Sequence, residues 1–115
     1  MPRSVEQLLR DVIEVNGRVQ VMMEGITLDQ YSESRTLQLA IERSLEIVGE
    51  ALRQLRDKDP ELIARVDGYH SFVSLRHIIA HRYAVLEDEI LWVTATNALP
   101  RLSGLVESLL NELRK

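Results

Sequence analysis

Residues 37–55 read LQLAIERSLEIVGEALRQL, and this stretch decides the fold class. Its apolar residues recur at helical spacing and form a wide stripe, which consists of Leu37, Leu39, Ala40, Ile41, Leu45, Ile47, Val48, Ala51, Leu52 and Leu55. Because the stripe is wide, we expect a long helix that starts near Ser34, ends by Pro60 and packs on more than one side. Gly49 lies inside this helix, where a glycine often lets another backbone come close.

A capping motif and a second apolar stripe predict another helix near the start of the chain. Ser4 can cap this helix while Gln7 reaches back to the cap backbone, which is the arrangement of a capping box. Helically spaced apolar residues follow, namely Val5, Leu8, Leu9, Val12, Ile13, Val15 and Val19. We expect the helix to run from Val5 to about Met23, with Gly17 weakening its middle.

The rest of the chain reads as shorter helical segments. We expect a turn of helix around Leu28–Tyr31 and a short helix over 61–65 that Pro60 opens. A further helix is capped by Ser71 or Ser74 and ends near His81, and another covers 87–97. Beyond a bend at Pro100, a last helix has an apolar stripe that consists of Leu102, Leu105, Val106, Leu109, Leu110 and Leu113. No strand-like alternation of useful length occurs. We therefore expect an all-α antiparallel bundle of five to six helices.

Length and composition are those of an ordinary globular domain. The 115 residues are 45% hydrophobic and 28% charged, which predicts a single domain over 1–115 with one core. Five Gly and three Pro are too few for an all-β chain with many turns. The absence of cysteine excludes disulfides, thiol catalysis and cysteine-based zinc sites.

Charge and hydropathy limit the classes of partner that we expect. Eighteen acidic residues against fourteen Lys and Arg give a formal net charge of −4, which argues against a broad basic face for nucleic acid but allows a small basic site. The longest apolar run, Ile90–Val93, is far too short to cross a membrane. The first residues lead straight into an amphipathic pattern, so we expect no signal peptide and a cytoplasmic location.

The chemistry-bearing stretch is RHIIAHRY, residues 76–83. Arg76 supplies a permanent, forked positive charge suited to phosphate. His77 and His81 can give and take protons near neutral pH. Together these side chains form a minimal set for cleaving a phosphodiester without a metal. A simpler interpretation stays open, because a histidine near a helix end can just interact with the helix dipole.

The motif resembles the signature of HEPN-domain ribonucleases, in particular the HepT toxin family. Three further landmarks carry the resemblance, which spans about Ser34 to Leu102: the long-helix segment Ala40–Ala51, Trp92, and the step Leu99–Leu102. His77 takes the place that relatives commonly give to Asn or Asp.

The resemblance implies the toxin of a toxin–antitoxin pair that cleaves RNA without a metal or other cofactor of its own. His81 would act as general base or general acid and Arg76 would hold the phosphate, with His77 in a supporting role. RNA and not DNA would be cut, because the reaction uses the 2′-hydroxyl.

The spacing of the two main residues raises a geometric question. Five residues of ideal helix separate Arg76 from His81 by about 140° around the axis, so the two side chains cannot converge on one small target. Either His81 lies just past the helix end, or a second copy of the chain completes the site. The resemblance implies the second device, a homodimer with the active site at its interface.

Tyr83 completes the motif. Chemistry alone favours a half-buried ring with its hydroxyl in water. The resemblance instead implies that Tyr83 is the modification site, to which an MntA-type nucleotidyltransferase antitoxin transfers AMP from ATP with Mg²⁺. The added phosphate would block RNA from the cleft.

Two other functions compete with this interpretation. His77 and His81, four residues apart, are half of a zinc-binding pattern that His70 could join, but a catalytic zinc needs three protein ligands and only two are placed. Alternatively, the chain is a non-catalytic HEPN partner of a nucleotidyltransferase. On the long helix, we expect Glu42, Arg43, Glu46 and Glu50 to form a solvated or interface face.

Overall fold

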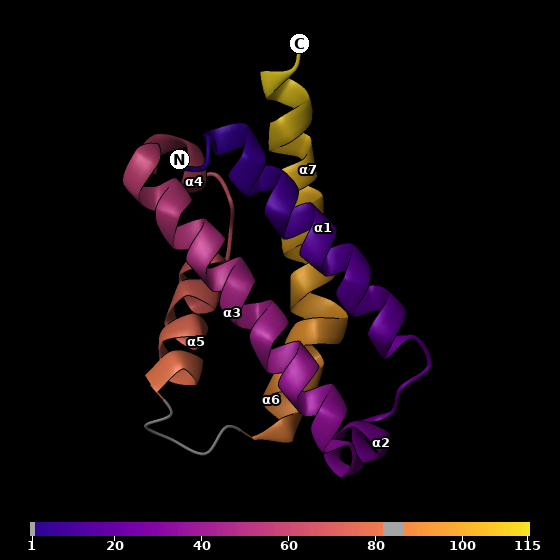
Figure 1. The fold of residues 1–115 in the computed structure, drawn as a ribbon. Coiled ribbons are helices and arrows are strands. Elements are labelled where there is room, and N and C mark those ends of the chain that lie inside the picture. Colours follow the sequence, from indigo (N-terminus) through magenta and orange to yellow (C-terminus); the bar gives the residue numbers. More distant parts are fainter. Residues whose placement is uncertain (1, 82–86) are drawn as a thin grey trace.

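The stripe over residues 37–55 forms the central helix, α3, which runs over Arg35–Lys58. The structure is a computed structural model that describes residues 2–81 and 87–115, with only the backbone of His81. Helix α3 packs against α1 on one side and against α5 on the other, as the wide stripe predicts. Neighbouring helices of the bundle run antiparallel (Figure 1). The described residues contain no strand, so the all-α prediction is confirmed.

Helix α1, Val5–Met23, has the predicted bounds and the predicted cap. The Ser4 side chain accepts a hydrogen bond from the Gln7 backbone, and the Gln7 side chain accepts one from the Ser4 backbone. The apolar stripe of α1 is buried against α3 and α7, and the resulting core is largely aliphatic. A short helix, α2 (Leu28–Glu33), follows where a turn of helix was predicted.

Helix α5, Tyr69–His81, starts earlier than the sequence predicts. Ser71 and Ser74 are therefore not caps but lie inside the helix. The reason is Gly68, whose φ of 88° turns the chain sharply after the short helix α4, Pro60–Ile63. The Gly68 carbonyl then accepts a hydrogen bond from the Ser71 backbone.

The bend predicted at Pro100 is built differently. Helix α6, Asp88–Val93, passes into a π-helical turn, Thr94–Ala98, which leads directly into α7, Leu99–Leu113. The Leu99 N–H donates to the Thr94 carbonyl, five residues earlier. Proline has no N–H and crowds the carbonyl four residues before it, so a widened turn just ahead of Pro100 relieves that strain without breaking the helix.

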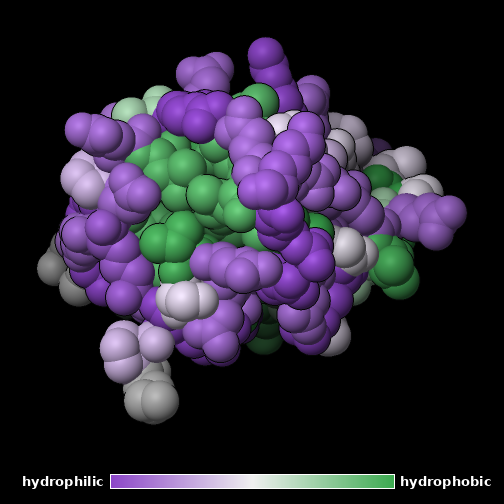
Figure 2. All heavy atoms as spheres, turned by 90° about the horizontal axis from the view of Figure 1, so that it is seen from above, coloured by the Kyte–Doolittle hydropathy of each residue, from purple (hydrophilic) through white to green (hydrophobic). Residues whose placement is uncertain are grey.

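Side chains from distant segments hold this widened turn in place. Gln20 on α1 donates to the Ala95 carbonyl at 2.8 Å. The Trp92 indole donates to the Ile26 carbonyl at 3.0 Å, which fixes α6 against the segment before α2. Seen from above the view of Figure 1, the surface is mostly hydrophilic around an apolar area (Figure 2). No helix in the described part of the chain is long and apolar enough to span a membrane.

Candidate active site

Arg76 lies on α5 directly against Gly49 of α3. A Cβ atom placed on Gly49 would lie 2.3 Å from the Arg76 Cβ and 2.7 Å from the Phe72 carbonyl oxygen, so only glycine fits there. The sequence-based expectation that Gly49 admits another backbone is thus confirmed, and the helix that it admits is the one that carries the motif.

An acidic side chain of α3 contacts the motif arginine. Glu50 Oε2 lies 3.3 Å from Arg76 Nη2, and the two side chains are 28% and 31% exposed. Arg53, one turn along α3, donates to both oxygens of Glu50, at 2.7 and 3.1 Å. These hydrogen bonds from Arg53 lower the pKa of the Glu50 carboxyl. Burial raises this pKa in part, whereas a hydrogen bond from Gln54 and the charge of Arg76 lower it further.

Glu50 is therefore more than the solvated or interface residue expected from the sequence. It is charged at neutral pH and holds two arginines near one another. The Arg76 Nε, by contrast, is buried and makes no hydrogen bond to the described residues, so the arginine is anchored through its Nη2 end. No local pattern in the sequence marks this cluster, because Glu50 and Arg53 lie on a different helix from Arg76.

Two grooves flank Arg76. The first, of about 370 Å³, has mixed charge and is lined by Arg3, Leu8, Asp11, Arg43, Glu46, Ile47, Glu50, Ala51, Gln54 and Arg76. The second, of about 420 Å³, is lined by Arg53, Arg56, Val73, Ser74, Arg76, His77 and Ile78. We call the second one the basic groove. Arg53 and Arg56, which the sequence analysis did not single out, enter this site only because α3 packs on α5.

The histidines follow Arg76 along α5. His77 is exposed and lines the basic groove. His81 is the last residue of α5, one helical turn beyond His77, and its side chain lies outside the described residues. Because the structure keeps His81 in the helix, the alternative that it lies just past the helix end does not hold. The angular separation of about 140° between Arg76 and His81 remains.

The tyrosines and the possible metal ligands complete the list of residues that the sequence singled out. Arg82 and Tyr83 lie outside the described residues. Tyr31 is fully buried on α2. At the start of α5, the centroids of the Tyr69 and His70 rings lie 3.9 Å apart. Among the side chains that the structure describes, no three ligand-type residues gather into a metal site.

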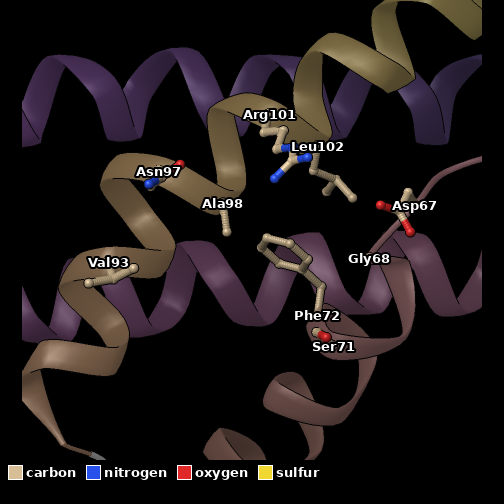
Figure 3. A pocket seen from close by; sticks show the side chains of 9 residues that line it. All are labelled: Asp67, Gly68, Ser71, Phe72, Val93, Asn97, Ala98, Arg101 and Leu102. Carbon is tan, nitrogen blue, oxygen red and sulfur yellow. The ribbon is translucent and has the colours of Figure 1, made fainter.

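A third groove separates α5 from α6 and α7. Ser71, Phe72, Ser74, Leu75 and Ile78 line it on α5, and Ile90, Thr94 and Ala98 line it on the other side. Towards the other end of α5, the Phe72 ring points at Ala98 and Leu102 across the gap (Figure 3). No histidine lines either part of this groove among the described residues, so we assign it no catalytic role. We call the part between Ile78 on α5 and Ile90 on α6 the apolar groove, because Asp67, Asn97 and Arg101 line the other part.

Comparisons with known proteins agree with the resemblance of the motif. The 28% identical protein named "Putative RNase MJ1380" from Methanocaldococcus jannaschii aligns over 91% of this chain and 95% of its own length. "Probable ribonuclease HepT" from Thermococcus cleftensis is 26% identical over 95% of this chain and 98% of its own. "Putative RNase TTE0752" from Caldanaerobacter subterraneus is 28% identical over 78% of this chain and 80% of its own. No solved structure gives a significant match.

The family comparison covers nearly the whole bundle. The model of the family described as "Ribonuclease HepT-like" matches residues 9–109, which leave out only the first turn of α1 and the last turn of α7 among the helices. Arg76, His77 and His81 lie within the matched range. By this match, the chain belongs to the HepT-like ribonuclease family.

Proposed function

We propose that this protein is a toxin of a toxin–antitoxin pair that acts as a metal-independent endoribonuclease. The observation that carries the proposal is the fixed position of Arg76, pinned to α3 at Gly49 and paired with Glu50 in a chain of the HepT-like ribonuclease family. A guanidinium already held in place loses little freedom when it binds a phosphate, which makes it an effective electrostatic catalyst.

The reaction proceeds by transfer within the RNA backbone. The 2′-hydroxyl oxygen attacks the adjacent phosphorus, a general base takes its proton, and the bond to the 5′-oxygen of the next nucleotide breaks. A general acid returns a proton to that leaving oxygen, which yields a 2′,3′-cyclic phosphate and a free 5′-hydroxyl. His81 serves as base or acid, and Arg76 offsets the charge that develops on the phosphate.

The proposed site is shared by two copies of the chain. Five residues of helix separate Arg76 from His81 by about 140° around the axis of α5, so a second α5 is needed to bring both residue types to one phosphate. The apolar groove is the surface that we assign to the second copy. It meets the basic groove at Ser74 and Ile78, so a copy bound there would reach the basic groove. Two of its lining residues, Ile78 and Ile90, are 36% and 49% exposed.

Control by modification completes the proposal. An MntA-type nucleotidyltransferase transfers AMP from ATP, with Mg²⁺, to the hydroxyl of Tyr83, and pyrophosphate leaves. The new phosphate competes with RNA for the arginines of the site. Full burial of Tyr31 removes that tyrosine as an acceptor, because an enzyme cannot reach its hydroxyl in the folded protein, whereas Tyr69 is only partly buried.

Cleavage of a labelled random-sequence RNA oligonucleotide in the presence of EDTA tests the proposed reaction. Wild-type protein should cut, whereas Arg76→Lys and His81→Ala should lose activity by a factor of about 10²–10⁴, the usual contribution of a positioned catalytic group. Arg10→Ala, an exposed arginine on α1, is the matched control and should cut normally. A wild-type protein that leaves RNA intact, or a His81→Ala variant as active as wild type, would refute the catalytic role.

A further inference from the structure

The basic groove differs in charge from the rest of the molecule. Arg53, Arg56 and Arg76 line it together with His77, and the described residues place no carboxylate in its lining. The groove on the other side of Arg76 contains Asp11, Glu46 and Glu50 as well as its arginines. In a chain of formal net charge −4, a groove whose acidic and arginine lining residues are all arginines is a local exception.

The arginines of α3 differ in how much of their hydrogen-bonding capacity is used. Arg53 is held on both sides, by Glu50 and by Asp57 Oδ2 at 3.0 Å. Arg56 Nε lies 3.7 Å from Asp57 Oδ1, which is too far for a hydrogen bond, and the Arg56 side chain is 41% exposed. The guanidinium of Arg56 therefore keeps donors for a ligand, and Arg53 is fixed beside it.

The groove is also continuous with the candidate active site. Arg76 and His77 belong to both, and the backbone of His81 follows one helical turn beyond His77. Ser74 adds a hydroxyl to the lining, while Val73 and Ile78 offer apolar contacts. Charge, a hydroxyl donor and apolar patches in one track suit a single-stranded nucleic acid, whose phosphates, sugars and bases alternate.

We propose that the basic groove binds the RNA backbone next to the scissile phosphate, with Arg56 as the main contact to a neighbouring phosphate and Arg53 as a fixed second charge. This inference rests on the proposed ribonuclease function, because the substrate that it guides is the RNA to be cut at Arg76. It adds two residues of α3 to a site that the motif confines to α5.

Binding of a 2′-O-methyl RNA oligonucleotide, which cannot be cleaved, tests the groove separately from the reaction. Affinity is measured by fluorescence anisotropy over a series of salt concentrations. Loss of one phosphate contact in Arg56→Ala should weaken binding several-fold at low salt and reduce the slope of log K against log salt by about 0.7, the value for single strands. Arg56→Glu should weaken binding further, and Arg56→Lys should retain most of the affinity.

Arg43→Ala is the matched control. Arg43 lies on the same helix, is 70% exposed and lines the mixed-charge groove, so its loss changes the net charge equally without touching the basic groove. Equal affinities and salt slopes for Arg43→Ala and Arg56→Ala would overturn the inference.

The two proposals fail in different ways. If cleavage depends on Arg76 and His81 but the Arg56→Glu variant binds RNA as tightly as wild type, the role of the basic groove alone is refuted. If wild type cuts no RNA, but Arg56→Ala and Arg56→Glu bind RNA more weakly than wild type while Arg43→Ala does not, the proposed groove is supported and the proposed catalysis is refuted.

Discussion

Gly49 of α3 and Arg76 of α5 approach so closely that a Cβ atom on the glycine would lie 2.3 Å from the Cβ of the arginine. The contact joins backbone to backbone, because the Phe72 carbonyl lies 2.7 Å from the same position. A residue in the middle of one helix thus sets the position of Arg76 on another.

Gly49→Ala should both destabilise the protein and impair cleavage. The new methyl group meets a Cβ and a carbonyl oxygen, neither of which can rotate away, so α5 must shift. Overpacking of this kind costs about 1–3 kcal/mol. Urea unfolding measures the loss of stability, and RNA cleavage at saturating substrate measures the displacement of Arg76.

Gly17→Ala provides the contrast. Gly17 is exposed in the middle of α1, and nothing lies within 4 Å of its added Cβ. Alanine in a helix is favoured over glycine by about 0.5–1 kcal/mol, so this variant should gain stability and cleave normally. If Gly49→Ala unfolds at the same urea concentration as wild type, the close approach does not constrain the helices.

Glu50→Gln should make stability less sensitive to acid. The pKa of Glu50 in the folded protein lies below its usual value of 4.5, because Arg53 hydrogen-bonds the carboxylate. As the pH falls, the Glu50 carboxyl therefore takes up a proton in the unfolded chain before it does so in the folded protein. Wild type loses stability as the pH falls from about 4.5 through the lower pKa of the folded protein. The stability difference between wild type and Glu50→Gln should be largest at neutral pH and shrink below about pH 4.5.

The same substitution should also affect the reaction. Without the carboxylate, Arg76 loses the group 3.3 Å away that orients it, so cleavage at saturating RNA should slow. Glu46→Gln is the control, since Glu46 lies one turn earlier on α3 and pairs with Arg43 instead. Equal rates for the Glu50 and Glu46 variants would contradict a positioning role for Glu50.

Tyr31→Phe should be as stable as wild type at neutral pH and more stable in alkali. The Tyr31 hydroxyl is buried and has no hydrogen-bond partner among the described residues, so its removal leaves no donor unpaired. Burial, with the charges of Glu42 and Asp88, raises the Tyr31 pKa well above 10. Above about pH 10 the unfolded chain alone loses this proton, so wild type is destabilised while the variant is spared. Thermal unfolding of both proteins from pH 8 to 11 checks the divergence.

Ile90→Asp should produce monomers and abolish cleavage. Ile90 is 49% exposed on α6 and lines the apolar groove, where a charge would oppose burial against a second copy. Val21→Asp, at a residue of α1 that is 75% exposed, introduces the same charge elsewhere and should remain dimeric and active. Light scattering at micromolar concentration decides the matter, and a monomeric wild type would remove the basis for a shared site.

Tyr83→Phe should escape neutralisation by the cognate nucleotidyltransferase. Intact-mass measurement after incubation with the antitoxin, ATP and Mg²⁺ should show one added AMP on wild type and none on the variant. Tyr69→Phe is the control and should be modified like wild type. An adenylate mapped to Tyr69 would show that the motif tyrosine is not the acceptor.

Local patterns predicted the helices well because their causes are local. The capping box at Ser4 and the apolar stripes predicted the bounds of α1 and α3. The start of α5 and the π-helical turn before Pro100 were missed. The first depends on the turn at Gly68, and the second depends on how α6 and α7 share one continuous helix held by Gln20 and Trp92.

The sequence by itself determined the all-α class, the main helices and the residue types of the motif, because helical spacing, caps and a short run of chemistry-bearing residues are all read within a few turns of chain. Only the tertiary structure decided what surrounds Arg76. Glu50, Arg53 and Arg56 lie more than a dozen residues away and carry no pattern that marks them as its neighbours. They reach the motif because Gly49 lets two helices touch, and such a contact between distant residues is a property of packing that no local pattern encodes.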